Sequence, residues 1–436
     1  MSGRLAMVLH THMPYVEGFD TWPFGEEWLW EAVATSYLPV LDVLERTGAP
    51  ITLSLTPVLC DQLAAPGAMD RCLTFLRDVR PESHRIDLAE QRAELRPAIR
   101  RSAAQYEQAA ERLAGTELLA AFASRAAWTS SATHAVLPLV ASDAGARLQI
   151  VSGVQSHRKR FGDGWRGGFW LPECAHATWL DHLLEDAGAH ATCVDLTDVF
   201  GLGSRKHLRP LRTEAGIALV PLDRQTIELV WSEHGYPADG AYRDYHHRTR
   251  MDHRPWAVDG TPYDAERAHA LAREHAVDFV ARALVRSQEA DDALVVCALD
   301  TELLGHWWYE GPQWLEAVVA ECDRQGLALE HLDDALEQVE PADAPPLPET
   351  TWGTPRDLST WSGPGVEDFA WRARRAELDI LRAGPGATPR AVRELLALQS
   401  SDWAFLVHRD LAAAYGRERA AAHRALLSQE LGSLGS

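Results

Sequence analysis

Short apolar runs rich in β-branched residues alternate with longer amphipathic stretches along most of this sequence. An alternation of this kind requires parallel strands joined by helical crossovers, which is an α/β fold. The amphipathic stretches include residues 26–48 and 264–288, whose apolar positions recur at helical spacing. The number of expected strands, seven, is one short of the common eightfold barrel. The expected strands are residues 5–10, 49–55, 126–132, 167–172, 190–196, 217–222 and 293–300.

Three stretches depart from this alternation. Residues 61–125 have helical spacing and no strand pattern, which predicts a helical insertion. Residues 223–262 lack regular periodicity, and so long an irregular stretch in a compact domain is usually functional; we expect an active-site loop region there. The Pro-rich residues 340–353 are expected to form a linker or a lining loop, and helical patterns follow them, among them one expected helix over residues 388–416. We therefore expect a barrel domain over residues 1–345, which carries the site, and a C-terminal helical domain over residues 346–436 that contributes to the cleft.

Charge and composition exclude several classes of function. The net charge of −21 argues against nucleic acid and against anionic lipid as partners. No run of eighteen apolar residues occurs, so no membrane span is expected. The opening MSGRLAMVLHTHMPYV becomes polar too quickly for a signal peptide and is expected to form the first strand. The six cysteines are scattered without a CxxC pair or zinc-ligand spacing, which predicts reduced core thiols in a cytoplasmic protein.

Polar residues stand at the ends of the predicted strands, where parallel α/β barrels place their reactive groups. His10 and His12 end the first strand, and their spacing of two puts both side chains on one side. This pair suits either a metal site or hydrogen bonding to a polar ligand. His134, Glu173 and Asp300 follow or end three later strands, so we expect all five side chains on one face of the molecule.

Glu173 directly follows the run GGFWLP, at the mouth of a buried strand, where the desolvation of a carboxylate needs a reason. A structural alternative is that Glu173 is the N-cap of a helix over CAHATWLDHLLEDAG. Paired with Asp300, it suits glycosidic chemistry, in which a retaining enzyme holds a nucleophile and an acid/base about 5–5.5 Å apart. The 16 tryptophans, an excess that often accompanies sugar ligands, would supply flat platforms. Glu302 could lie next to Asp300 without contacting the substrate and raise the pKa of Asp300.

The motifs HTHMPY, SATHAVLP, WLPECAH, LDTELLGHWWYEG and LALQSSDWAF occur in this order over residues 10–405. Together they resemble the five conserved regions of glycoside hydrolase family 57, in particular those of its α-1,4-glucan branching enzymes. The resemblance implies a distorted (β/α)7 barrel with a helical insertion and a C-terminal all-helical domain. It implies that Glu173 is the nucleophile and Asp300 the general acid/base. The substrate-binding residues that it implies are His10, His12, His134, His306 and Asp402.

A further stretch, WSEHGYPAD, resembles the family's flexible loop, whose tip tyrosine is linked to transfer rather than hydrolysis, and Tyr236 takes that place. A phenol on a mobile loop could cover a covalent intermediate and exclude water. The sequence departs from the family at Ala238, at Leu304 and in the stretch WGTPRDLSTW, which leaves acceptor and chain-length preference open. The resemblance also implies cleft tryptophans at Trp22, Trp28, Trp256, Trp352 and Trp361.

The leading prediction is a retaining α-1,4-glucan branching enzyme, with amylose or a glycogen-like polymer as substrate, no cofactor and no metal. Water as the acceptor would make it an α-amylase, and a 4-hydroxyl would make it a 4-α-glucanotransferase; the GYP loop favours branching. Two alternatives belong to other classes: a deacetylase-like hydrolase with zinc on His10, His12 and an aspartate, and a glucan-binding protein with little turnover. A monomer or a weak homo-oligomer is expected. His246, His247 and His253 are expected on a solvated loop.

Overall fold

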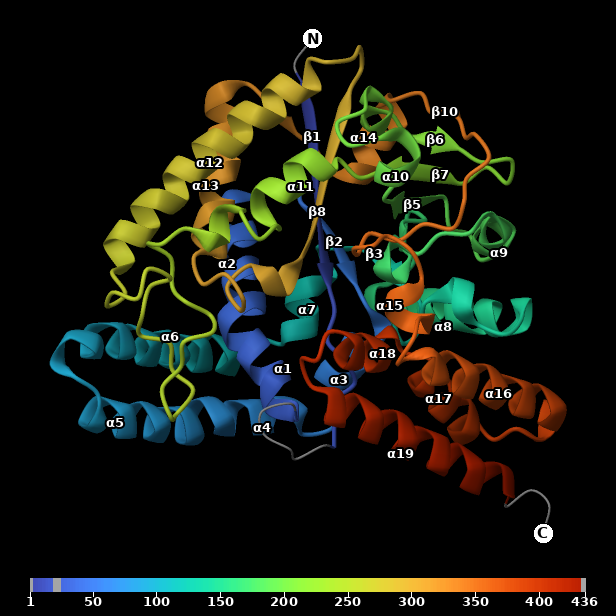
Figure 1. The fold of residues 1–436 in the computed structure, drawn as a ribbon, viewed down its shortest axis with the longest axis horizontal. Coiled ribbons are helices and arrows are strands. Elements are labelled where there is room, and N and C mark those ends of the chain that lie inside the picture. Colours follow the sequence, from blue (N-terminus) through green and yellow to red (C-terminus); the bar gives the residue numbers. More distant parts are fainter. Residues whose placement is uncertain (1–2, 19–24, 433–436) are drawn as a thin grey trace.

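The strands lie in the middle of the molecule with helices around them, in a computed structural model that describes residues 3–18 and 25–432 (Figure 1). All seven expected strands are present in these residues. Three further strands of two residues each, β6, β9 and β10, were not expected, because two residues leave no periodic pattern. The strands are β1 Arg4–Thr11, β2 Thr52–Leu55, β3 Ala126–Ser130, β4 Phe169–Trp170, β5 Ala191–Val194, β6 Leu211–Arg212, β7 Ala218–Pro221, β8 Leu294–Asp300, β9 Ala328–Leu329 and β10 Ala342–Asp343.

The seven predicted strands close into a ring within the described residues. β4, β3, β2, β1 and β8 pair in that order, all in parallel. β5 pairs in parallel with β7 in a second sheet, which β6 and β10 extend. A parallel bridge between Gly168 and Ala191 joins β4 to β5, and the amide of Asp223, just after β7, donates to the carbonyl of Val296 in β8 at 2.9 Å. The predicted distorted (β/α)7 barrel is therefore confirmed.

The helices fill the connections between these strands and continue beyond them. The stretch expected as one helix over residues 26–48 is continuous but contains a π-helical turn, η1 (Val33–Tyr37). Of the helices in the described residues, none is long and apolar enough to cross a membrane. The α-helices are α1 Glu26–Ala32, α2 Leu38–Thr47, α3 Pro57–Leu63, α4 Ala68–Thr74, α5 Arg80–Glu90, α6 Arg96–Ala114, α7 Leu118–Ala123, α8 Asp143–Phe161, α9 Asp181–Asp186, α10 Thr197–Phe200, α11 Arg224–Val230, α12 Ala265–Ser287, α13 Gly311–Gln325, α14 Leu332–Gln338, α15 Ser359–Ser362, α16 Glu367–Ala383, α17 Pro389–Leu398, α18 Ser401–His408 and α19 Ala413–Gly432.

Residues 61–125 contain helices and no strand, as their helical spacing predicts. In this insertion α5 and α6 pack side by side, and the yellow-green loop of residues 241–262 crosses in front of them (Figure 1). The loop is tied to α5 by a hydrogen bond from Thr249 to Asp87 and an ion pair between Arg250 and Glu90. The insertion and the loop therefore form one wall of the molecule.

The region 223–262 is more ordered than its sequence suggests. It begins with α11, and its later part contains turns whose backbone groups hydrogen-bond to one another. His246 and His247 are exposed as expected, but the expectation for His253 is wrong: only 2% of its surface is exposed. Its imidazole stacks on His84 of α5 at 3.8 Å between ring centroids and accepts a hydrogen bond from Arg80. The structural reason is that α5 and α6 cover this part of the loop.

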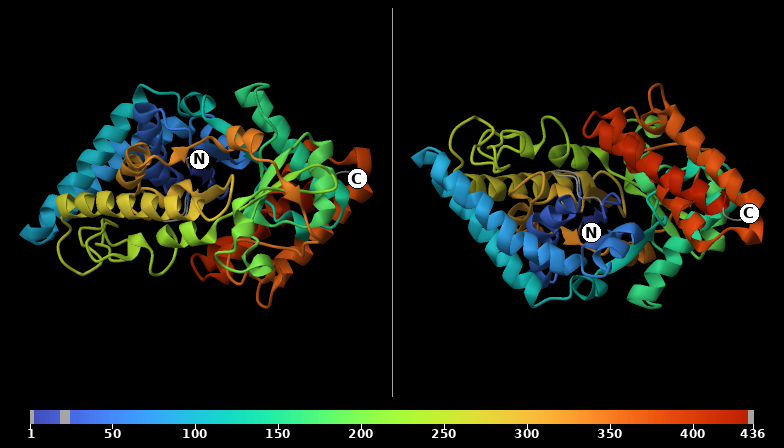
Figure 2. Two further views of the ribbon diagram at one scale, coloured as in Figure 1. Left: turned by 90° about the horizontal axis from the view of Figure 1, so that it is seen from above. Right: turned by 90° about the horizontal axis from the view of Figure 1, so that it is seen from below.

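The C-terminal helices α16 to α19 lie at the opposite end of the molecule from the helical insertion, as both views in Figure 2 show. The stretch expected as one helix over residues 388–416 is divided into α17, α18 and the start of α19. The first break is stabilised by Ser400, which caps α18 by accepting a hydrogen bond from the amide of Asp402. That break turns the chain so that Ser401 and Asp402 face the barrel strands.

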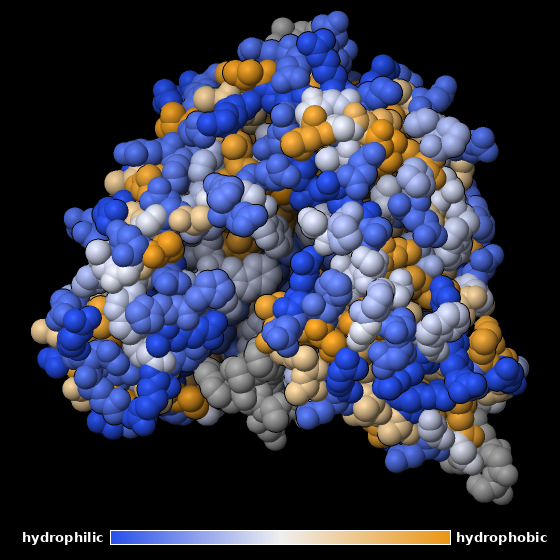
Figure 3. Space-filling view, in the orientation of Figure 1, coloured by the Kyte–Doolittle hydropathy of each residue, from blue (hydrophilic) through white to orange (hydrophobic). Residues whose placement is uncertain are grey.

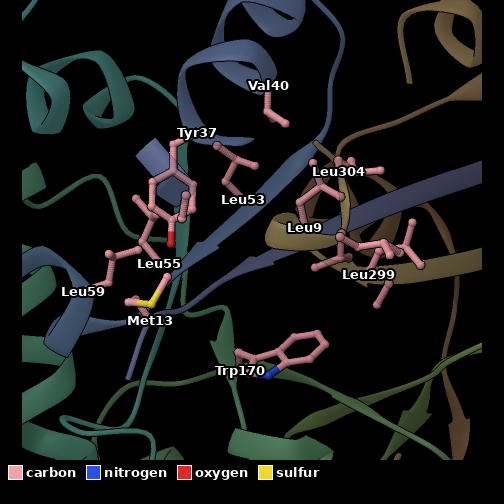
Figure 4. Packing of buried hydrophobic residues seen from close by; sticks show 14 of the residues in the cluster. Leu9, Met13, Tyr37, Val40, Leu53, Leu55, Leu59, Trp170, Leu299 and Leu304 are labelled. Carbon is pink, nitrogen blue, oxygen red and sulfur yellow. The ribbon is translucent and has the colours of Figure 1, made fainter. Parts of the chain in front are cut away.

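The main core lies between β1, β2, β8 and the helices that cover them. Figure 4 shows Leu9, Leu53 and Leu299 from these three strands, with Val40 above them and Tyr37 beside Leu53. On the outside, Figure 3 shows a largely hydrophilic face with scattered apolar residues and a hollow near its centre. All six cysteines are buried and unpaired, as expected for core thiols.

Candidate active site

Four strand ends bring the predicted histidines and carboxyls together. His10 and Asp300 are register partners in neighbouring strands, β1 and β8. The Nε2 atoms of His10 and His134 lie 3.0 Å apart, and the rings of His12 and His134 stack at 3.9 Å. Burial, followed by the neighbouring imidazoles, holds the pKa of His10 and of His134 well below the ordinary value. These two histidines are therefore neutral near pH 7 and offer hydrogen bonds rather than charge.

Glu173 follows β4 in a buried 3₁₀ turn (Pro172–Cys174) and has a left-handed backbone, with φ 61° and ψ 18°. The N-cap alternative is wrong, because α9 starts only at Asp181 and its N-cap is Leu180. The Oγ of Ser401 donates to Oε1 of Glu173 at 3.0 Å, and the indole N–H of Trp352 donates to Oε2 at 3.4 Å. Burial raises the pKa of Glu173 to about 7, although these two hydrogen bonds act in the opposite sense.

Asp300 is the last residue of β8 and lies within electrostatic reach of two other carboxyls. Burial, followed by the carboxyls of Glu302 and Glu173, raises the pKa of Asp300 well above its ordinary value. Glu302 is only 4% exposed and accepts hydrogen bonds from the hydroxyl of Tyr37 at 2.7 Å and from the amide of His12 at 3.1 Å. Burial also raises the pKa of Glu302 to about 7. This arrangement agrees with the expectation that Glu302 raises the pKa of Asp300.

Three of the seven non-glycine residues with positive φ in the described part of the chain lie at this site. His134, Glu173 and Cys174 are non-glycine residues with φ values of 58°, 61° and 48°. Left-handed backbone at such residues costs on the order of 1–3 kcal/mol each, and it persists where the surrounding structure enforces it. Such strain is typical of functional sites, so the observation supports a role for His134 and Glu173 that a purely structural turn would not explain.

Asp402 at the start of α18 closes the site from the C-terminal side. Its Oδ1 lies 3.0 Å from Nε2 of His12. Burial lowers the pKa of His12, but Asp402, Glu302 and Glu173 more than reverse this, so the pKa is raised. Among the described residues, His12, His134 and Asp402 form a group whose possible ligand atoms lie within 4.8 Å of one another. This group differs from the zinc set considered from the sequence, and each of its members already has a hydrogen-bond partner within the protein.

Aromatic side chains continue outward from Glu173. Trp352, which contacts Glu173, packs edge to face against Trp170 and Trp231 at 5.2 and 5.8 Å. Trp231 is 37% exposed and lies 6.0 Å from Trp307, measured between ring centroids. Trp231 and Trp307 were not predicted as site residues, although Trp231 begins the stretch WSEHGYPAD and Trp307 lies within LDTELLGHWWYEG. The signal that could have found Trp231 is its place at the start of the WSEHGYPAD stretch.

The other predicted cleft tryptophans have different surroundings. Trp28 is partly buried against the core, and Trp256 stacks on His247 with ring centroids 3.7 Å apart. Trp361 is 3% exposed, so its indole is enclosed in this structure and does not offer an open face. Trp22 lies outside the described residues.

His306 is buried beneath the site and reaches Thr35 of the π-helical turn η1 at 3.3 Å. Gly305 makes this approach possible: its φ is 102°, and a Cβ atom there would stand 1.9 Å from the carbonyl oxygen of Thr35. The same turn supplies Tyr37, whose hydroxyl holds Glu302. The π-helical turn and the loop after β8 therefore fix each other in place.

Tyr236 lies in a 3₁₀ turn (Tyr236–Ala238) after α11 and points to α12 in this structure. Its hydroxyl donates to Asp278 at 2.7 Å, and its ring stacks on His275 at 4.4 Å. Arg282 also donates to Asp278, at 2.7 Å. The expected contact of Tyr236 with the reaction centre is thus not formed in this conformation of the loop.

The barrel, together with the carboxyls and the stacked histidines at its strand ends, defines a carbohydrate-active α/β-barrel protein. Residues 127–348, more than half of the chain, match the sequence profile of glycosyl hydrolase family 57, and residues 382–431 match that of the C-terminal region of 1,4-alpha-glucan branching enzymes. The chain belongs to glycosyl hydrolase family 57.

Similar proteins agree with this assignment. A 1,4-alpha-glucan branching enzyme of Thermococcus kodakarensis is 30% identical over 97% of this chain and 72% of its own length. A probable 1,4-alpha-glucan branching enzyme of Mycobacterium tuberculosis is 32% identical over 99% of this chain and 92% of its own. The crystal structure of a branching enzyme of this family from Pyrococcus horikoshii superimposes with a TM-score of 0.91 at 32% identity, covering 97% of this chain and 88% of that one.

Proposed function

We propose that this protein is a retaining 1,4-α-glucan branching enzyme. The observation that carries the assignment of roles is the difference in surroundings between the carboxyls of Glu173 and Asp300. Glu173 accepts hydrogen bonds from Ser401 and Trp352, which stabilise its ionised form. By contrast, burial and two neighbouring carboxyls raise the pKa of Asp300. Hydrogen bonds to a carboxylate favour its ionised form, whereas burial and neighbouring carboxyls favour the protonated form. Glu173 is then the nucleophile, and Asp300 keeps the proton that a general acid needs.

The reaction proceeds by double displacement. Asp300 donates its proton to the glycosidic oxygen as the bond from C1 breaks, and a carboxylate oxygen of Glu173 bonds to C1. The first fragment leaves with a new 4-hydroxyl. Asp300, now a carboxylate, takes the proton of an acceptor 6-hydroxyl, whose oxygen bonds to C1 while the ester bond to Glu173 breaks. The sum is one α-1,4 linkage cleaved and one α-1,6 linkage formed.

The remaining site residues would position the sugar at the reaction centre. His10 and His134 are neutral and buried, so they are suited to hydrogen bonds with sugar hydroxyls. Asp402 lies beside His12 and raises the pKa of that imidazole, so the two form a charged pair. In this pair Asp402 would accept a hydrogen bond from a sugar hydroxyl and His12 would donate one to the same sugar. We propose that His306 acts indirectly, by holding the loop after β8 against η1.

Transfer rather than hydrolysis requires that water be kept from the covalent intermediate. Tyr236 would do this if its loop left α12 and turned over the site. The similar proteins are named as branching enzymes, which supports transfer rather than hydrolysis. An α-amylase and a 4-α-glucanotransferase use the same two carboxyls and differ only in the acceptor. A cytoplasmic location and a monomer or weak homo-oligomer stay expectations; the six unpaired thiols support the first.

The test is to incubate the protein with amylose and to count reducing ends before and after debranching with isoamylase. New reducing ends that appear only after debranching would support α-1,6 transfer. Reducing ends that appear before debranching would indicate hydrolysis instead. The Glu173→Gln variant is the control, because it keeps the size of the side chain and removes the nucleophile. If zinc is bound and neither product forms, the metal-dependent alternative replaces this proposal.

A further inference from the structure

A polar pocket lies between the helical insertion and the loop after β8. Its empty space, which is partly open to solvent, amounts to about 450 Å³, and it is here called the insertion pocket. Its walls come from four parts of the chain: the end of α1 with η1, the helices α5 and α6, the loop of residues 241–262, and the loop of residues 305–309. Of its lining residues, His306 alone was among the site residues predicted from the sequence. The lining residues used below are Gln105, Arg243, Tyr245, Arg254, Trp307 and Tyr309.

The charges around the insertion pocket balance. Three acidic side chains, Glu31, Asp244 and Asp252, line it together with the guanidinium groups of Arg80, Arg243 and Arg254. Arg80 forms a 3.2 Å ion pair with Glu31. A pocket without a net excess of positive charge is a poor site for a phosphate or another anion. The chemistry of the walls therefore favours a neutral polar ligand.

Two unused hydrogen-bonding atoms narrow the class of ligand. Oε1 of Gln105 and Nε of Arg254 are buried and have no partner within the protein. One is an acceptor and the other a donor, and a hydroxyl group can satisfy both kinds of atom. A buried polar atom without a partner costs about 1–3 kcal/mol, so a ligand rich in hydroxyl groups would be stabilised here.

The aromatic and charged walls are held in place before a ligand arrives. The guanidinium of Arg254 lies 4.3 Å over the ring of Tyr245, and that of Arg243 lies 4.3 Å over the ring of Tyr309. The loop of residues 241–262 is anchored behind them by the stacked His253, which bonds to Arg80 and to Ser83 of α5. Walls fixed in this way lose little conformational entropy on binding.

The insertion pocket is connected to the reaction centre by the chain and by aromatic rings. Its lining residues His306 and Trp307 come six and seven residues after Asp300, on the loop after β8. Trp307 contacts Trp231, which contacts Trp352, which donates to Glu173. The general acid/base meets the oxygen of the leaving chain and later that of the acceptor, so glucan beyond that oxygen lies on the side of the Asp300 loop.

From this geometry we propose that the insertion pocket binds a distal glucose unit of the acceptor glucan chain, through Gln105, Arg254 and the face of Trp307. This inference rests on the proposed function, because it assigns the acceptor of that reaction. The pocket would then select acceptor chains by length, because only a long enough chain reaches the pocket while it presents a 6-hydroxyl to Asp300.

The test compares two glutamines of the same helix, α6. Gln105 lines the pocket, whereas Gln108 is exposed on the outside of the helix. The apparent KM for added maltoheptaose is measured with amylose as a saturating donor, for wild type, Gln105→Leu and Gln108→Leu. Loss of one uncharged hydrogen bond should raise this KM about two- to tenfold in Gln105→Leu. Gln108→Leu should match wild type. Thermal unfolding checks that each variant folds, and Gln105→Ala serves if Gln105→Leu does not.

A binding experiment separates this inference from the proposed function. Calorimetric titration of maltoheptaose uses the Glu173→Gln background, in which turnover does not consume the sugar. If wild type branches amylose but both glutamine variants bind and use maltoheptaose equally well, the pocket inference is overturned and the branching proposal stands. If wild type does not branch but maltoheptaose binding still depends on Gln105, the branching proposal falls and the pocket remains a glucan site. Binding of inorganic phosphate that is lost in Arg254→Met, without any effect of Gln105→Leu on sugar binding, would overturn the assignment to glucan.

Discussion

Replacement of Ser401 with alanine should move the acidic limb of the pH–rate profile to higher pH. Ser401 donates to Oε1 of Glu173 at 3.0 Å, and this bond lowers a pKa that burial has raised to about 7. The nucleophile must be ionised, so kcat/KM falls as the pH drops through the pKa of Glu173 in the free enzyme. Without the hydroxyl, the ionised form loses a stabilising partner and the pKa rises further.

The expected size of the shift follows from the energy of a hydrogen bond to a charged group. Such a bond contributes about 1.5–3 kcal/mol, and one pKa unit corresponds to about 1.36 kcal/mol. The acidic limb should therefore move upward by about 1–2 pH units. Trp352→Phe removes the longer bond, at 3.4 Å, and should shift the limb in the same direction by a smaller amount.

The assay is the release of product from amylose, measured as kcat/KM from pH 4.5 to pH 9 in buffers of constant ionic strength. Ser401→Thr is the matched control, because it retains the hydroxyl and should leave the limb near its wild-type position. Ser401 also lies 2.8 Å from Nδ1 of His134, so the control separates loss of the hydroxyl from disturbance of that ring. An acidic limb that stays in place or moves to lower pH in Ser401→Ala would refute the claim that Glu173 is the ionised nucleophile tuned by Ser401.

Four further outcomes are expected. Asp300→Asn should lower kcat on amylose about 10²–10⁴-fold, and cleavage of an aryl maltoside with a good leaving group should be affected much less. Glu302→Gln should shift the basic limb to lower pH, because a carboxyl that raises the pKa of Asp300 is replaced by an uncharged amide; an unchanged limb would contradict that effect. Glu173→Gln should stabilise the protein at pH 8 by about 3 kcal/mol, measured by denaturant unfolding. Because folding raises the pKa of Glu173 from 4.5 to about 7, the native state binds more protons than the unfolded chain and loses stability as the pH rises through that range. The gain in stability should vanish below pH 4.5. Asp278→Ala should release the hydroxyl of Tyr236 and speed hydrogen exchange in the loop after α11, whereas equal exchange rates would show that this contact does not restrain the loop.

The strands of the barrel could be predicted because each is a run of apolar, β-branched residues bounded by polar ones. β1 and β8 are clear examples, and the structure extends the first by one residue at each end. The two-residue strands β6, β9 and β10 could not be predicted, since their pairing depends on neighbours far away in the sequence. The π-helical turn η1 was also hidden, because its residues fit an ordinary helical pattern.

The site residues at the strand ends could be predicted from the sequence, but the residues that hydrogen-bond to them could not. Glu173 and Asp300 follow apolar runs, where a carboxyl is conspicuous. Tyr37 holds Glu302 across 265 positions, and Ser401 reaches Glu173 across 228, so no local pattern could indicate either contact. The break before α18 had a local signal, the helix-capping Ser400, which the reading of residues 388–416 as one helix overlooked.

The sequence by itself determined the alternation of strands and helices, the residue types at the strand ends and, through its motifs, the family. These properties depend on short segments, because periodicity and capping act over a few residues. The tertiary structure alone decided which carboxyl is stabilised as an anion, where the phenol of Tyr236 rests and how four separate segments enclose the insertion pocket. Burial and long-range contacts set the pKa values and the pocket walls, and both exist only once the ring of strands has closed.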